Sequence, residues 1–213
     1  TPTAGFDAFT SELSARIREG MTTRGIPGIA VGVISGDQEF TAGFGVTNIN
    51  HPLAVAVDTL FQIGSIGKTY TATAMMRLVE DGRVDLDAPV RTYLPDFQVA
   101  DEAVAAAVTV RQLMNHSAGW IGDDFTDTGT GDDALARYVA LQAENPQISP
   151  LGAHFSYNNV SFSIAGHLIE VVTGKTYREA LTELVLEPLG LNDTYLYPEQ
   201  VMTRAFTVGH TGT

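Results

Sequence analysis

The sequence predicts an α+β (mixed α/β) fold in which a β-hairpin near the N-terminus precedes a long, mostly helical stretch. Two β-branched runs, Gly28–Ser35 and Glu39–Thr47, flank the turn residues Gly36 and Asp37, a pattern typical of an antiparallel hairpin. Elsewhere, apolar residues recur at every third or fourth position, which indicates helices. A chain of 213 residues is long enough for one domain.

The predicted helices follow in chain order. They cover Phe6–Met21, Ser65–Asp81, Val108–His116, the segment from its cap at Asp132 or Asp133 to Glu144, Asn159–Thr173 and Tyr177–Leu186. The second of them is apolar on nearly every face, so we expect it to be buried and to end at Gly82. Residues 1–60 form the N-terminal helix and hairpin of an α/β region, residues 61–190 form a mostly helical region, and residues 191–213 begin a return to the sheet.

The composition excludes several kinds of partner and site. With 25 acidic and 12 basic side chains the net charge is −13, and so acidic a surface repels nucleic-acid phosphates and anionic lipid headgroups. The absence of cysteine excludes disulfides, thiolate nucleophiles and cysteine-based metal sites. His51, His154 and His167 lack the spacing of metal ligands, so we expect neither a metal nor another cofactor.

Long apolar runs are missing from the sequence. The longest, Ile29–Ile34 and Ala103–Val108, have about six residues, against the roughly 20 that a membrane span needs, so we expect no span. The chain opens with Thr1-Pro2-Thr3 and no methionine, as it would after removal of a signal peptide or after trimming. On this ground we expect an exported protein, either secreted or periplasmic.

Ser65 and Lys68 lie three residues apart on a predicted helix, so the lysine amine can reach the serine hydroxyl. A serine hydroxyl needs a base to become a good nucleophile, and a lysine buried in an apolar helix can lose its proton and act as that base. The backbone N–H of Ser65, at the helix start, can face an oxyanion. The alternative is an ordinary serine and lysine on one helix.

Tyr157-Asn158-Asn159 forms a Tyr-x-Asn triplet just before another predicted helix. A tyrosine beside a lysine can relay protons to a leaving group, and the Asn159 amide can hold a substrate carbonyl. Either asparagine can instead cap the helix, a role that is compatible with catalysis. Together with Ser65 and Lys68, the triplet indicates nucleophilic catalysis by a serine.

A resemblance to a known family runs from about Gly28 to Leu196. The segment LFQIGSIGKTYTATAMMRLVEDGRVDLDAPVRTYLPDF resembles the nucleophile region of the penicillin-recognising serine hydrolases, in the branch of class C β-lactamases, DD-peptidases and β-lactamase-like esterases (peptidase S12-like). Three further segments resemble that family in the same order: VTVRQLMNHSAGW, LGAHFSYNNVSFSIAGHLIEVVTGKTYREAL and EPLGLNDTYL. The resemblance implies a β-lactamase-like fold, with an antiparallel sheet and an all-helical region.

The resemblance also implies a role for each motif residue. These roles are the acylated nucleophile for Ser65, its base partner for Lys68, a proton shuttle for Tyr157 and a substrate-binding amide for Asn159. By the same analogy, His116 is expected to have a structural hydrogen-bonding role in its turn.

Trp120 stands at the mouth of the polar, Gly-rich segment Ser117–Gly131, where it can line a substrate pocket or serve in packing. The acidic residues in and after this segment fail the calcium-loop template because Phe125 and Gly129 occupy ligand positions. We expect them to form a solvated loop and a helix cap; they are Asp123, Asp124, Asp127, Asp132 and Asp133.

The family's third motif, Lys-Thr-Gly or a His-x-Gly variant, lies on a strand beside the site. His210-Thr211-Gly212 matches it in type, so His210 is a candidate substrate-binding residue. It follows Tyr157 by only about 50 residues, where the family usually needs roughly a hundred or more. The preceding segment VMTRAFTVGH better resembles one that follows the family's Pro-Leu-Gly turn.

In that second interpretation, the C-terminal strands of the family are absent from this chain. Two strands alone make a marginal sheet with an unpaired edge. We therefore expect a C-terminal fragment, a second chain or a neighbouring molecule to complete the sheet.

The function expected from these residues is that of a serine hydrolase that cleaves an amide or ester through a Ser65 acyl-enzyme, of the esterase or D-amino-acid peptidase type. Three alternatives stay open: a β-lactamase or DD-carboxypeptidase, a catalytically silent homologue that binds a ligand, and an assembly protein. The expected substrate is a small molecule or a peptide.

Overall fold

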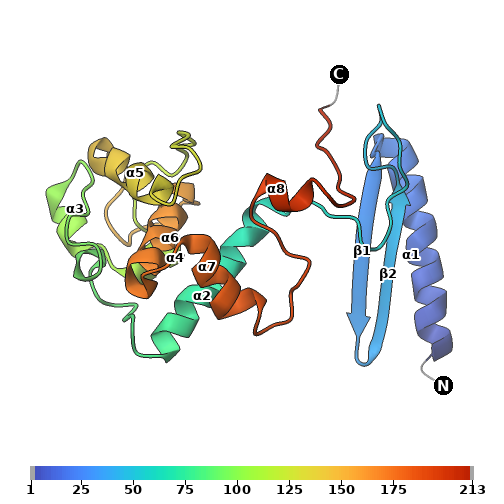
Figure 1. Cartoon of the computed structure of the whole chain (residues 1–213), viewed down its shortest axis with the longest axis horizontal. Helices are drawn as coiled ribbons and strands as arrows, with labels where there is room; N and C mark the ends of the chain where they lie inside the picture. The colour runs from blue at the N-terminus through green and yellow to red at the C-terminus, as the bar shows by residue number, and fades with distance from the viewer. Residues whose placement is uncertain (1–2, 212–213) are drawn as a thin grey trace. The chain divides into compact units, whose positions relative to one another are not determined.

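The computed structural model describes residues 3–211, which divide into two compact units (Figure 1). The hairpin unit contains the residues up to Ile63 together with those from Tyr195 onward. The helical unit contains Gly64–Thr194. All residues of the Ser-x-x-Lys and Tyr-x-Asn motifs belong to the helical unit.

The hairpin unit begins with helix α1 (Thr3–Arg24), which is followed by the strands β1 (Gly28–Ser35) and β2 (Gln38–Gly45). The strands pair antiparallel, with Ser35 opposite Gln38 at the turn and Gly28 opposite Gly45 at the far end. The turn needs a positive φ at its first residue, and Gly36 supplies it with φ +60°. The predicted hairpin is therefore confirmed.

The second strand ends two residues earlier than the sequence predicts. Gly45 has φ +74°, a left-handed conformation that takes the chain out of the strand. Beyond it, Val46 forms an isolated bridge with Ala54, and its N–H donates to the Pro27 carbonyl at 2.8 Å. The Val55 N–H donates to the Gly45 carbonyl at 3.0 Å. The pattern of β-branched residues continues past the strand, but the backbone turns.

The C-terminal segment of the hairpin unit returns beside the residues that precede the helical unit. After helix α8 (Pro198–Val201), Phe206 forms a parallel bridge with Leu60. The Leu60 N–H donates to the Ala205 carbonyl at 2.8 Å, and the Val208 N–H donates to the Thr47 carbonyl at 3.2 Å. Residues 205–208 thus bond to two other segments of the hairpin unit, at Leu60 and at Thr47, without forming a strand.

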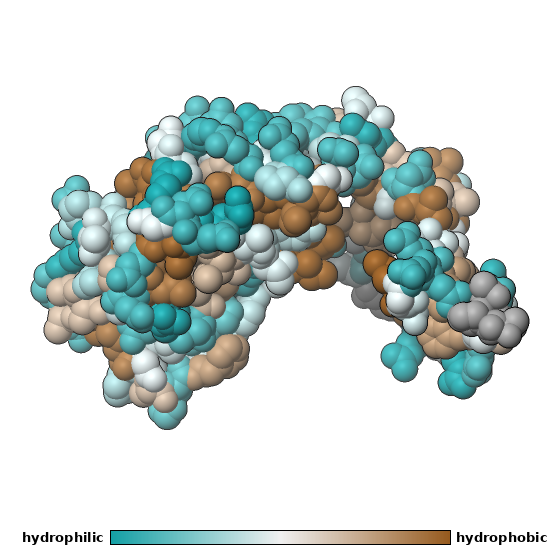
Figure 2. Space-filling model, turned by 90° about the horizontal axis from the view of Figure 1, so that it is seen from below, coloured by the Kyte–Doolittle hydropathy of each residue, from teal (hydrophilic) through white to brown (hydrophobic). Residues whose placement is uncertain are grey.

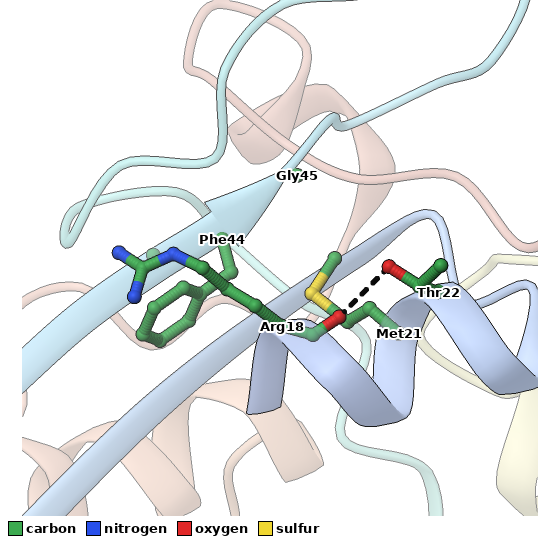
Figure 3. Close-up of a pocket in the computed structure, with 6 residues that line it drawn as sticks. Arg18, Met21, Thr22, Phe44 and Gly45 are labelled. Atoms are coloured by element: carbon green, nitrogen blue, oxygen red, sulfur yellow. Dashed lines mark hydrogen bonds between the residues drawn. The ribbon is translucent and has the colours of Figure 1, made fainter. Parts of the chain in front are cut away.

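Helix α1 packs against β2, where the Arg18 guanidinium lies over the Phe44 ring at 5.0 Å from its centroid. A shallow pocket opens between these elements (Figure 3), and Met21, Thr22 and Gly43 are among the residues that line it. The Thr22 hydroxyl bonds to the Arg18 carbonyl at 3.0 Å. None of the residues that the sequence points to for catalysis lies in this pocket.

The helical unit consists of short helices around a central one. Its elements are η1 (Gly64–Ile66), α2 (Gly67–Glu80), η2 (Val90–Thr92), α3 (Glu102–Ala107), α4 (Val110–Met114), α5 (Ala134–Leu141), η3 (Gln142–Glu144), α6 (Asn159–Thr173), α7 (Tyr177–Leu181) and the π-helical turn η4 (Thr182–Leu186). Helix α6 contacts α2, α4, α5 and α7. It is buried because it is apolar around most of its circumference, and Gly174 ends it with φ +69°.

Local capping accounts for the short helices. Thr109 and Gln112 form a capping box at α4, and Thr176 and Glu179 form one at α7, so two N–H groups at the start of each helix are satisfied. Asp101 caps α3, an Ala-rich helix that the apolar spacing does not predict.

Two expectations about helices need correction. Asp133 occupies the N-cap position of α5 but makes no capping hydrogen bond, because its carboxylate pairs with Arg137 instead. Helix α2 is not buried all round: Met75 and Leu78 are fully buried, whereas Met76 is 50% exposed. The reason is that α6, α7 and η4 pack against α2 and cover only part of its circumference. Figure 2 shows such exposed apolar residues in brown among polar ones.

None of the helices among residues 3–211 combines the length and the apolar character that a membrane span requires. The described residues also hold no group of three or more histidine, aspartate or glutamate side chains arranged to bind a metal ion.

Candidate active site

Ser65 and Lys68 lie side by side at the start of α2. Ser65 belongs to the turn η1, which leads directly into the helix, so the two side chains are one turn apart. The Lys68 ammonium donates a hydrogen bond to the Ser65 hydroxyl oxygen at 3.3 Å. Ser65 is exposed, and Lys68 is half-buried rather than buried as the apolar helix led us to expect.

Asn159 reaches the same lysine from α6. Its side-chain oxygen accepts a hydrogen bond from the Lys68 ammonium at 2.6 Å, across 91 residues of sequence. The other end of the amide, Nδ2, donates to the Asp123 carboxylate at 2.7 Å. The lysine is therefore held between the serine hydroxyl and the amide.

Tyr157 completes the cluster. Its side chain is 45% exposed, and the Lys68 nitrogen lies 4.8 Å from the centre of its ring. Hydrogen bonds from Lys68 and from Ser65 lower the pKa of the Tyr157 phenol, because they stabilise the phenolate. Phe162 also faces the lysine, with its ring centre 5.6 Å from Nζ.

Asn158 explains why its two neighbours project into the site. It is the N-cap of α6, where its side-chain oxygen accepts from the Ser161 N–H at 2.8 Å. Its amide nitrogen donates to the buried Trp120 carbonyl at 3.1 Å. Of the two asparagines that qualified as caps, Asn158 therefore caps the helix, and Asn159 contacts Lys68.

The loop before α5 is bonded directly to the start of α6. The Gly122 carbonyl accepts from the N–H groups of Asn159 at 2.9 Å and Val160 at 3.1 Å. A Cβ on Gly122 would lie 2.7 Å from the Tyr157 carbonyl oxygen, so only glycine allows this approach. Asp123 follows immediately and is thereby placed beside Asn159.

His116 has the structural role that the resemblance implies. Its Nδ1 accepts the Asn158 N–H at 3.0 Å, and its ring stacks on Tyr157 with 4.6 Å between ring centres. Burial, and then the charge of Lys68, lower the pKa of His116. Its backbone has φ +62°, a strained value for histidine that the surrounding contacts maintain.

Two further candidates make their described contacts with other residues. Trp120 is fully buried and packs against Phe97 with 6.1 Å between ring centres, so it serves the core and does not line an open pocket. His210 belongs to the hairpin unit, on no strand, and its Nε2 accepts the Ile49 N–H at 3.1 Å. Gly212, the last residue of the His-x-Gly match, lies outside the described residues.

One residue that the sequence did not single out for the site is Asp123, which we expected to belong to a solvated loop. Its partner Asn159 is 36 residues away, and no periodicity or spacing relates the two. The neighbouring Asp124 fits the loop interpretation only partly. Its carboxylate accepts from Thr126 and Gln142 and so ties the loop to η3.

Comparison with known proteins identifies the family to which this site belongs. The family described as Beta-lactamase matches residues 13–213. The chain belongs to the beta-lactamase family. The resemblance to penicillin-recognising serine hydrolases, and the fold that it implies, are thereby confirmed.

Among the curated relatives of this beta-lactamase-family chain, Penicillin-binding protein 4 of Amycolatopsis lactamdurans is 39% identical over 192 residues, which are 90% of this chain and 50% of the relative. The unguisins hydrolase ungD of Aspergillus violaceofuscus (strain CBS 115571) is 32% identical over 179 residues, which are 80% of this chain and 32% of the relative. The chain thus spans half or less of the length of these relatives.

Two solved structures are similar to this chain in fold. The octameric penicillin-binding protein homologue from Pyrococcus abyssi superposes with a TM-score of 0.79 at 29% identity, over 94% of this chain and 47% of that one. SurE, solved with D-Leu, gives a TM-score of 0.77 at 29% identity, over 86% of this chain and 41% of that one.

Proposed function

We propose that this chain carries the nucleophile of a serine hydrolase that cleaves an amide or an ester through an acyl-enzyme on Ser65. Lys68 is the base partner of the serine, Tyr157 relays the proton, and the Ser65 backbone N–H helps to hold the oxyanion. Asn159 supplies the amide that binds the substrate carbonyl. Membership of the beta-lactamase family supports this assignment.

One observation carries the proposal: the Lys68 nitrogen lies 3.3 Å from the Ser65 hydroxyl oxygen and 2.6 Å from the Asn159 oxygen. A nucleophile needs a proton acceptor within hydrogen-bonding distance, and the contact to Asn159 keeps the lysine there. The Tyr157 phenol, whose pKa Lys68 and Ser65 lower, is a second proton acceptor in reach of the same serine.

The proposed reaction has two halves. In the first, the Ser65 oxygen bonds to the substrate carbonyl carbon, and its proton passes to the neutral Lys68 amine or to the Tyr157 phenolate. The bond to the leaving amine or alcohol breaks, and the leaving group takes that proton. In the second half, water adds to the acyl ester, its proton goes to the same base, and Ser65 leaves with a proton returned.

For the substrate we favour a carboxylic ester or a peptide that contains a D-amino acid. The name of the unguisins hydrolase and the D-Leu in the SurE structure support hydrolysis and a D-amino-acid ligand, respectively. A β-lactamase or DD-carboxypeptidase is the second candidate, which the similarity to a penicillin-binding protein favours.

We also propose that strands from outside these residues complete the sheet of the hairpin unit. The two-stranded sheet leaves Ile34 76% exposed, and a hairpin of two strands is marginal by itself. The extra strands can come from a C-terminal fragment or from a second chain. Export, to the periplasm or to the medium, stays part of the proposal.

Covalent labelling tests the proposed function. A fluorophosphonate or a penicillin, followed by mass spectrometry, should give an adduct on Ser65 that is lost in Ser65→Ala. Lys68→Ala should suppress labelling about as severely, because nucleophile and base act as a unit. Lys175→Ala is the matched control, since Lys175 pairs with Glu183 on the surface and is the other lysine of the sequence.

The outcomes separate the candidates. A native chain without an adduct is the silent, ligand-binding homologue, and a stoichiometric complex with a partner that survives Ser65→Ala marks an assembly role. Labelling that is near normal in Lys68→Ala assigns the base role to Tyr157. Turnover of penicillins or cephalosporins far above that of p-nitrophenyl esters supports the second candidate instead of an esterase.

A further inference from the structure

The Asn159 amide stands between two groups of opposite charge. On one side its oxygen accepts from the Lys68 ammonium at 2.6 Å, and on the other its nitrogen donates to the Asp123 carboxylate at 2.7 Å. Both contacts are charge-assisted hydrogen bonds, which are stronger than bonds between neutral groups. The three side chains form one row that ends at the Ser65 hydroxyl.

This row permits one orientation of the amide. The two ends of an asparagine side chain have nearly the same shape but opposite hydrogen-bonding character. If the amide turned over, its NH₂ group would face the Lys68 ammonium and its oxygen would face the Asp123 carboxylate. Both contacts would then be repulsive. Asp123 therefore decides which end of Asn159 meets the lysine.

The backbone places Asp123 for this role. The Gly122 carbonyl accepts from the N–H groups of Asn159 and Val160, so the residue before Asp123 is bonded to the first turn of α6. The residue after it, Asp124, accepts from Gln142 at 3.0 Å. The Asp123 side chain is exposed and its described contact is with Asn159, so the core does not depend on it.

We propose that Asp123 is a positioning residue of the active site: it holds the Asn159 amide with its oxygen towards Lys68 and thereby keeps the lysine beside Ser65. The inference rests on the proposed function in that it assigns Asp123 to the Ser65 reaction. It goes beyond that proposal because the Ser-x-x-Lys and Tyr-x-Asn motifs do not include Asp123.

Labelling rates in three variants test the role. Asp123→Ala removes the partner of the amide, and we expect fluorophosphonate labelling of Ser65 to slow by about ten-fold, the effect of losing a hydrogen bond to a charged group. Asp123→Asn should recover most of the loss, because its side-chain oxygen still accepts from Asn159. Asp132→Asn is the matched control, since it removes the same charge from an exposed position before α5.

The pH profile of labelling separates positioning from a merely structural role. The titratable groups that face one another here are Lys68, Tyr157, His116 and Asp123. The negative charge of Asp123 disfavours loss of the proton from the Tyr157 phenol and so acts to raise its pKa. Removal of that charge in Asp123→Asn should therefore move the acid limb of the profile to lower pH. Asp132→Asn should leave the limb unchanged.

A second readout does not depend on reactivity. In NMR spectra, the Asn159 side-chain NH₂ signals, assigned by their loss in Asn159→Ala, should exchange slowly with water and should exchange faster in Asp123→Ala. Unchanged exchange would overturn the proposal, as would equal labelling of Asp123→Ala and native protein. If the native chain labels no faster than Ser65→Ala, the proposed function fails, and the exchange measurement still decides the role of Asp123.

Discussion

Asn158 is the residue whose removal should cost the helical unit most among the polar residues near the site. It is 1% exposed and uses both ends of its amide. Its oxygen caps α6 by accepting from the Ser161 N–H at 2.8 Å, and its nitrogen donates to the Trp120 carbonyl at 3.1 Å. Truncation to alanine leaves a buried donor and a buried acceptor without these partners.

The expected cost follows from these two contacts. Loss of an N-cap costs about 1 kcal/mol. A buried carbonyl left without its donor adds roughly 1–3 kcal/mol. Asn158→Ala should therefore destabilise the helical unit by about 2–4 kcal/mol, which is large beside the roughly 5–15 kcal/mol of a typical domain. Asn158→Ser keeps a capping oxygen and should recover about 1 kcal/mol of the loss.

Trp120 provides the assay. It is the one tryptophan of the sequence and is fully buried in the helical unit, so its fluorescence during urea unfolding reports on that unit alone. Asn192→Ala is the control, because Asn192 is exposed. If Asn158→Ala and Asn192→Ala unfold at the same urea concentration, or if Asn158→Ser is no more stable than Asn158→Ala, the two-contact account is refuted.

Two predictions concern titration. Lys68→Met should raise the pKa of Tyr157 towards its ordinary value, because the ammonium that stabilises the phenolate is lost. The pH dependence of the Tyr157 Cζ signal in NMR spectra measures this pKa. A titration midpoint that is the same in the variant and the native protein would contradict the prediction. His116→Asn should reduce the loss of stability on acidification. Burial and Lys68 lower the pKa of His116 in the folded protein, so the unfolded chain binds the proton more tightly. The contribution of neutral His116 to the free energy of unfolding is therefore fully present above the unfolded pKa of about 6.5. It is lost as the pH falls towards the folded pKa. Urea unfolding followed by Trp120 at neutral and mildly acidic pH checks this, and an equal loss in native protein and His116→Asn would contradict it.

Local patterns were sufficient for the hairpin and for most helices. The bounds of β1 match the β-branched run Gly28–Ser35, and those of α6 match Asn159–Thr173, because a turn glycine and a C-cap glycine end these elements. Helix α3 escaped prediction because six residues are too few for an apolar period to show. The end of β2 was misplaced because Gly45 adopts a conformation that no pattern encodes.

The sequence by itself determined the residues of the two motifs and the contact within the first. A spacing of three residues along one helical turn brings Ser65 and Lys68 together whatever the helix packs against, so their proximity is a local property. The family follows from the same local segments, because these segments and their order are what relatives share.

Tertiary structure alone decided the rest of the site. The meeting of Lys68 with Asn159 depends on how α2 packs against α6, and the contact of Asn159 with Asp123 depends on a loop bonded to the first turn of α6. The contacts of the two other candidates also come from tertiary structure, since Trp120 packs in the core and His210 bonds to Ile49 in the hairpin unit. Contacts between distant segments arise from packing of the whole unit, so the spacing of residues in the sequence does not predict them.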